Sequence, residues 1–147
     1  MRQLIIARKD LHMSPGKLAA QCCHASMAFM SNNIKTISET GIYDLGYSYK
    51  AIPIDRDIYE QWFQGVFTKT ILEAKNKNKL LKVKEYADQF GLKENEDYYL
   101  IKDNCLTELE PEEIDEHGVG RTLTCIGFKP LPNDIAKEIS RHYQLYR

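Results

Sequence analysis

The chain opens on a strand, a short turn and a long helix, and this order restricts the fold more than any other feature. An apolar run close to the N-terminus has the length of a buried strand. Ser14 is a good N-cap, and Pro15 suits the first helical position, where no backbone N–H is needed. The pattern predicts a strand over 3–8 and a helix over 15–31, with 32–38 as its frayed continuation or a loop.

Polar residues lie along one side of this helix. Lys17, Gln21 and His24 stand at positions i, i+4 and i+7, so at about 100° per residue they share a narrow stripe. A separate apolar face is formed by Leu18, Cys22, Ala25 and Phe29. Sites of open α/β sheets lie where strands end and helices begin. The stripe therefore predicts a functional site near the start of this helix.

The rest of the chain continues the alternation of strands and helices. We expect an irregular segment over 39–54, a short helix over 55–63, a strand over 66–74, a helix over 76–90, a strand over 98–101, an acidic loop over 103–120, a strand over 121–128 and a helix over 134–143. Helices between the first three strands imply parallel pairing, and the last strand is expected to be antiparallel. The predicted fold is α/β, a three-layer α/β/α sandwich on a mixed four-stranded sheet.

Length and composition describe an ordinary globular protein. The 147 residues suit one domain over 1–147, with 43% hydrophobic and 28% charged residues. No apolar run approaches the roughly 20 residues that span a bilayer, and the N-terminus is too soon polar for a signal peptide. We therefore expect a cytoplasmic protein without a membrane partner. The cysteines form no CxxC pair, which argues against zinc; they are Cys22, Cys23, Cys105 and Cys125.

Charge is unevenly distributed, although the net charge is only −1. Lysines crowd one segment and are Lys69, Lys75, Lys77, Lys79, Lys82 and Lys84. A local basic surface can bind phosphates, but a lysine run taken alone is more often a solvated helix face. We expect the first five of these lysines to form the rim that meets any nucleic acid, and the acidic run over 108–116 to point away from it.

The stretch from Arg8 to Ala25 resembles the signature of the archaeal–eukaryotic type of peptidyl-tRNA hydrolase. The matching residues are Arg8, Asp10, Leu11, Met13, Gly16, Lys17, Ala19, Ala20, Gln21, Cys22, His24 and Ala25. The motif is long and chemically mixed, and the resemblance extends over most of the chain. It implies hydrolysis of the ester that joins a peptide to tRNA, with tRNA as the partner and no metal or other cofactor.

The resemblance also implies residues for the site. The family has Asp-Ala-Gly-(Arg or Lys)-Thr-Gln where this chain has Asp103-Asn104-Cys105-Leu106-Thr107-Glu108, so Asp103 and Thr107 match. With Lys17 they are the expected catalytic residues, because an aspartate can orient water and an ammonium can stabilise a developing oxyanion. The lost basic residue at Leu106 and the acid at Glu108 would both weaken attraction to RNA.

The remaining candidates are expected to bind substrate. Lys17 lies in the first turn of a helix, where a cation is unfavourable unless an anion is near. On the same stripe, Gln21 and His24 are candidates to hold a ribose, a base or a water. Lys69 echoes the family's Gly-Gln-x-Lys strand start and is expected to contact the tRNA backbone.

Two alternatives stay open beside the peptidyl-tRNA hydrolase. One is a catalytically degenerate module of the same fold that binds RNA or a protein. The other is a hydrolase that acts on a related acyl ester. The sequence gives neither the acyl preference nor the oligomeric state, and it is compatible with a homodimer.

Overall fold

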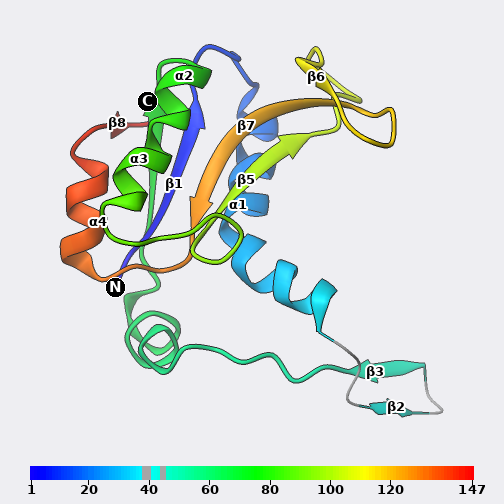
Figure 1. Ribbon diagram of the computed structural model, residues 1–147, viewed down its shortest axis with the longest axis vertical. Coiled ribbons are helices and arrows are strands. Elements are labelled where there is room, and N and C mark those ends of the chain that lie inside the picture. Colours follow the sequence, from blue (N-terminus) through cyan, green and yellow to red (C-terminus); the bar gives the residue numbers. More distant parts are fainter. Residues whose placement is uncertain (38–40, 44–45) are drawn as a thin grey trace.

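A mixed sheet forms the centre of the protein (Figure 1). The computed structural model describes residues 1–37, 41–43 and 46–147. Within these residues the sheet has six strands in the order β5-β7-β1-β4-β8, with β6 attached to β7. The strands are β1 (Gln3–Arg8), β4 (Lys69–Ala74), β5 (Tyr98–Asp103), β6 (Glu113–Ile114), β7 (Gly120–Phe128) and β8 (Gln144–Leu145). The predicted α/β class is confirmed, but the predicted count of four strands is wrong, because β6 and β8 extend the sheet.

The strand order differs from the one expected. β1, β4 and β5 point the same way, and β7 is antiparallel, as predicted. However, β7 lies between β1 and β5, so in the described part of the chain β5 pairs with β7 rather than with a parallel neighbour. The reason is the connection: β7 follows β5 without a helix, so it can return directly alongside it. The register of this pair shifts between Ile101 and Lys102, which makes Thr124 an extra residue on β7.

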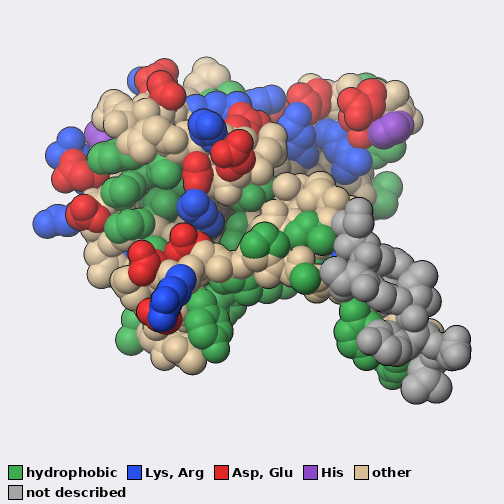
Figure 2. Space-filling view, turned by 60° about the horizontal axis from the view of Figure 1, so that its bottom comes forward, with side chains coloured by type: hydrophobic (Ala, Val, Ile, Leu, Met, Phe, Trp, Pro, Cys, Tyr) green, Lys and Arg blue, Asp and Glu red, His purple; other side chains and the backbone are tan. Residues whose placement is uncertain are grey.

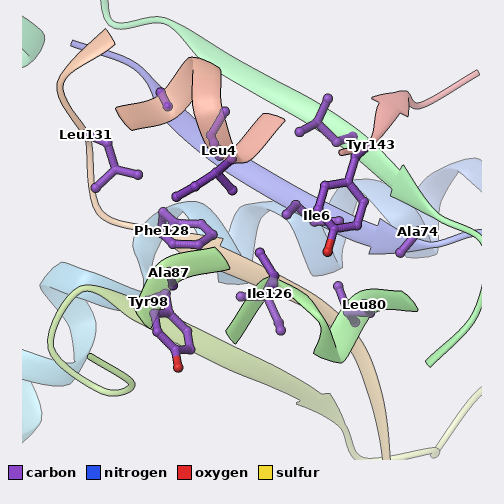
Figure 3. Packing of buried hydrophobic residues seen from close by; sticks show 14 of the residues in the cluster. Leu4, Ile6, Ala74, Leu80, Ala87, Tyr98, Ile126, Phe128, Leu131 and Tyr143 are labelled. Carbon is purple, nitrogen blue, oxygen red and sulfur yellow. The ribbon is translucent and has the colours of Figure 1, made fainter. Parts of the chain in front are cut away.

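Helices lie on both faces of the sheet. They are α1 (Pro15–Thr36), α2 (Lys77–Leu81), α3 (Val83–Asp88) and α4 (Asn133–Ser140), and a π-helical segment, η1 (Ile58–Val66), precedes β4. On one face Cys22 and Ala25 of α1 pack against Ile5 of β1. On the other face Leu4 and Ile6 belong to a larger core with residues of α2, α3 and α4 (Figure 3). This division follows from the alternation of side chains along a strand.

Helix α1 continues to Thr36, so the segment after 31 continues the helix, which is one of the two outcomes predicted for it. Other predicted boundaries need correction. The helix predicted over 76–90 is broken at Lys82 into α2 and α3. The segment predicted to be irregular contains two paired strands, β2 (Gly41–Tyr43) and β3 (Tyr47–Tyr49), while 38–40 and 44–45 lie outside the described residues. The described helices include none long and apolar enough to cross a membrane.

Helix α1 approaches β7 very closely at Gly127. A Cβ atom at this position would lie within 2.8 Å of Ala25 Cβ and would also clash with the Ala25 carbonyl oxygen. Only glycine therefore fits here without moving the helix. This contact fixes the distance between α1 and the sheet near the middle of the helix.

Candidate active site

Lys17 and Asp103 meet at the end of the sheet where β1, β4 and β5 finish. Lys17 lies in the first turn of α1, and Asp103 is the last residue of β5. Lys17 Nζ donates to Asp103 Oδ1 at 2.6 Å and to Thr107 Oγ1 at 3.2 Å. The side chains of Lys17 and Asp103 are only 14% and 10% exposed. The structure thus brings the three expected catalytic residues into one hydrogen-bonded group.

This group lines a small open pocket of about 220 Å³. His24 lies on its rim with an exposed side chain, on the same side of α1 as Lys17. Leu106 also lines the pocket and is 82% exposed, in the place where the family pattern has a basic residue. The pocket therefore combines a polar floor with an apolar side chain at its mouth.

Gln21 holds the Asp103 carboxylate through a hydrogen bond. Its side chain is buried, and its Nε2 donates to Asp103 Oδ1 at 3.0 Å. Thr124, the extra residue of β7, donates from Oγ1 to Gln21 Oε1 at 2.6 Å. A chain of contacts thus runs from β7 through α1 to the Asp103 carboxylate. The sequence motif gave no signal for Thr124, because only the strand pairing places it beside Gln21.

The environment keeps Asp103 ionised. Burial acts to raise the pKa of the Asp103 carboxyl, but hydrogen bonds from Lys17, from the Cys105 backbone and from Gln21 outweigh it, so the pKa lies below its ordinary value. The Cys105 N–H donates to Asp103 Oδ2 at 3.0 Å and closes a turn after β5. Asp103 therefore shapes the loop as well as facing the pocket.

Cys105 itself lies in the left-handed region, with φ of 56°. The family pattern has glycine at this position, which adopts that conformation at no steric cost. The departure at Cys105 thus leaves the backbone path of the loop in place and adds local strain. Its Sγ lies 3.4 Å from Thr122 Oγ1, which keeps the side chain packed against β7.

The acidic run does not point away from the basic residues, contrary to expectation. Arg8 is buried and donates to both Asp10 and Glu112, and Lys77 lies 3.2 Å from Glu112. The hydrogen bond from Arg8 lowers the pKa of Glu112 further than burial raises it. The ion pairs anchor this loop, because burying an arginine requires partners for its charge.

Lys69 is the one candidate that lies away from the pocket. It begins β4, at the opposite end of the sheet from Asp103. Its Nζ lies 3.2 Å from the centroid of the Phe67 ring and 4.7 Å from that of Trp62. Burial against these rings lowers the pKa of Lys69.

Other basic residues lie at the same end of the sheet as the pocket. Lys9 follows β1 and Lys75 follows β4, and with Lys79 they line a separate hollow of about 450 Å³. It is also lined by His12, His142 and two acidic residues, Asp10 and Glu73, and Glu73 lies 3.5 Å from Lys9. We call this the basic hollow. On the face of the molecule shown in Figure 2, lysine and arginine side chains are interspersed with acidic ones rather than forming a continuous patch. In the part of the chain that the structure describes, no three His, Cys, Asp or Glu side chains group as metal ligands would.

The fold and the site define an α/β protein with a polar Lys–Asp–Thr group at the ends of its strands, an arrangement suited to ester hydrolysis. The chain belongs to the peptidyl-tRNA hydrolase PTH2 family, which it matches over residues 1–146. This membership confirms the resemblance seen in the sequence.

Individual relatives cover nearly the whole chain. A peptidyl-tRNA hydrolase of Thermoplasma acidophilum is 26% identical over 144 residues, 98% of this chain and 97% of the relative. One of Methanopyrus kandleri is 35% identical over 130 residues, 88% of this chain and 84% of the relative. A solved structure of a protein of unknown function from Agrobacterium tumefaciens C58 superimposes with a TM-score of 0.52 at 9% identity, covering 99% of this chain and 97% of that one. This last likeness concerns the fold alone.

Proposed function

We propose that this protein hydrolyses the ester bond between a peptide and the terminal ribose of tRNA, releasing free tRNA. The observation that carries the proposal is the hydrogen-bonded group of Lys17, Asp103 and Thr107 that lines a pocket. It stands in a chain that matches the family over residues 1–146. We further propose that residues 1–147 act as one domain and that the reaction takes place in the cytoplasm.

Asp103 is proposed to orient the attacking water. Because its pKa is lowered, the carboxylate is ionised at neutral pH and acts as a hydrogen-bond acceptor. A weakly basic carboxylate of this kind is better suited to aligning a water than to removing its proton fully before attack. The contacts from Gln21 and Cys105 hold the carboxylate in one orientation.

Lys17 and Thr107 are proposed to stabilise charge on the other side of the ester. The Lys17 ammonium can face the oxyanion that develops on the former carbonyl oxygen. Thr107 Oγ1 accepts from Lys17, which leaves its own hydroxyl hydrogen to donate to the departing ribose oxygen. As the water oxygen bonds to the carbonyl carbon it gives up a proton, and as the bond from that carbon to the ribose oxygen breaks the ribose oxygen takes one up, so the group itself ends the reaction with its protons unchanged.

The expected substrate-binding residues differ in how exposed they are, and we propose different roles for them on that ground. His24 is exposed on the pocket rim, where it can contact the ribose or the terminal base. Gln21 is buried with both ends of its amide engaged, so we propose that it positions Asp103 instead of touching substrate. A contact of Lys69 with tRNA would have to involve a part of the backbone far from the ester.

Release of tRNA from peptidyl-tRNA by the purified protein tests the proposal. We expect multiple turnovers by the wild type and by the surface control Lys137→Ala, and a large loss in Lys17→Ala. Tight binding of peptidyl-tRNA without release would instead establish a binding module of the same fold. Hydrolysis of other acyl esters at higher kcat/KM would establish the related hydrolase.

A further inference from the structure

A shallow groove leaves the pocket along helix α1. At His24 the pocket continues into a hollow of about 420 Å³ between α1 and β5. His24, Met27 and Ser31 line it from α1, and Tyr99, Leu100 and Ile101 line it from β5. We call this hollow the α1–β5 groove.

The wall formed by β5 has unused hydrogen-bonding capacity. β5 is the last strand of the sheet on its side, as Figure 1 shows. Among the described residues, its outer edge has a bridge at Tyr98, to Glu94, and no strand beyond it. Every second residue of such an edge directs its N–H and C=O away from the sheet, where an extended peptide can pair with them. The edge from Tyr99 to Lys102 leads straight to Asp103.

The groove has the length and character of a peptide site. From Lys17 to Ser31, on the same side of the helix, α1 rises about 21 Å, which matches about six residues of an extended chain. Met27 is 51% exposed on the helix side and is flexible enough to contact varied side chains. The lysines of the basic hollow lie elsewhere, at Lys9, Lys75 and Lys79. Apart from Lys35 and His24 the residues that line the groove are uncharged, which suits the backbone of a peptide.

We propose that the α1–β5 groove binds the peptide portion of the substrate, as a strand added to the outer edge of β5. This inference rests on the proposed function, because a peptidyl ester held at Lys17 and Asp103 must direct its peptide out of the pocket. Pairing through backbone groups recognises any sequence, as an enzyme that acts on peptides of every sequence requires. The groove then selects for the presence of a peptide and for its length.

The test compares acyl chains of increasing length on one tRNA. We expect kcat/KM to rise about tenfold from an N-acetylaminoacyl-tRNA to a peptidyl-tRNA of several residues, the gain that two net backbone hydrogen bonds give. N-methylation at successive peptide positions should lower kcat/KM at alternate positions only, since alternate N–H groups face β5. Met27→Ala should reduce the ratio of long-chain to short-chain kcat/KM roughly two- to threefold. Leu145→Ala, a similarly exposed residue at the opposite edge of the sheet, should leave it unchanged.

The possible results of this experiment test the groove proposal and the proposed hydrolysis separately. Equal kcat/KM for short and long chains, with both hydrolysed, overturns the groove and leaves the proposed function standing. If N-methylation lowers kcat/KM equally at every peptide position, the proposed pairing of the peptide with β5 is overturned. If the wild type hydrolyses none of these esters, the proposed function fails, and the groove proposal fails with it.

Discussion

Glu108 is bonded twice to Ser14, the residue that caps helix α1. Its Oε1 accepts from the Ser14 hydroxyl at 2.6 Å, and its Oε2 accepts from the Ser14 N–H at 2.9 Å. Ser14 Oγ in turn accepts from the Lys17 N–H at 3.3 Å. A carboxylate is favourable at this end of a helix. The loop that carries Thr107 is thereby fastened to the helix that carries Lys17.

We predict that Glu108→Gln lowers KM for a tRNA substrate roughly two- to fivefold at low salt, with kcat preserved. The amide oxygen can still accept from the Ser14 N–H, and the amide NH2 can donate to the Ser14 hydroxyl oxygen in place of the contact that the carboxylate accepts. The substitution also removes one negative charge from beside the pocket. Glu108→Ala should lower kcat instead, because the loop is released. Steady-state kinetics at low and high salt distinguish the two variants, and identical behaviour would contradict a positioning role for the side chain.

The same contact predicts a pH dependence of the loop. Hydrogen bonds from Ser14 hold the pKa of Glu108 below its ordinary value of 4.5. Because the folded-state pKa is lowered, the stabilisation is fully present above the ordinary value and is lost as pH falls through the folded-state pKa. Amide exchange in the Thr107 loop of the wild type should therefore rise on acidification, and that of Glu108→Gln should rise less.

Lys17→Ala should lower kcat about 10²- to 10³-fold, because one charged group that stabilises the oxyanion is lost. Without Lys17, the pKa of Asp103 should also rise, since the ammonium is one of the groups that hold it down. Tm should be measured in parallel. A loss of Tm that accounts for the whole loss of activity would show a structural ion pair rather than a catalytic lysine.

Thr124→Val should lower kcat while changing KM little, because Gln21 loses the hydroxyl that orients it and Asp103 becomes less well held. A buried Gln21 Oε1 without a donor should also cost about 1–3 kcal/mol of stability. Thr124→Ser keeps the hydroxyl and should recover most of kcat. Failure of serine to rescue would mean that the methyl group, and hence packing, is what matters.

Cys105→Gly should raise the free energy of unfolding by about 1 kcal/mol, because glycine adopts a φ of 56° without steric cost. Cys105→Ala is the matched control: it removes the thiol but keeps Cβ, and it should not stabilise. Denaturant unfolding of the three proteins measures the effect. Equal stabilisation by both substitutions would assign it to loss of the thiol.

Replacing Lys75 and Lys79 together by alanine should reduce the salt dependence of tRNA binding. The slope of log affinity against log salt should fall by roughly 0.7–0.9 for each lost phosphate contact. Lys137→Ala, on the exposed side of α4, serves as the control and should leave the slope unchanged. Binding that is insensitive to salt would show that these lysines are exposed to solvent and make no contact with phosphates.

The sequence predicted the first part of the site well because it is local. The cap at Ser14, the start of α1 at Pro15 and the position of Lys17 all depend on residues within one helical turn. Asp103 and Thr107 were expected from their motif, and the structure places both beside Lys17.

The rest depends on contacts between distant segments. Gln21 was expected to hold a ribose, a base or a water, but β7 brings Thr124 against it, and its side chain is buried. The place of β7 in the sheet, and the two-residue strands β6 and β8, exist only through pairing that no local pattern encodes. Lys69 matched a motif position, yet the direction of β4 carries it to the far end of the sheet.

Strand β7 lies between β1 and β5, and this position determines when, during synthesis, the catalytic group can assemble. Lys17 and Asp103 follow strands that are joined, in the described sheet, through β7. Thr124, which orients Gln21, also comes from β7. During synthesis, then, every residue of the Lys17–Asp103–Thr107 group has been made before the strand that assembles it. A nascent chain that ends before Gly120 carries the group but lacks the strand that pairs with both β1 and β5 and that supplies Thr124, so we expect activity to arise only after the last long strand has been made.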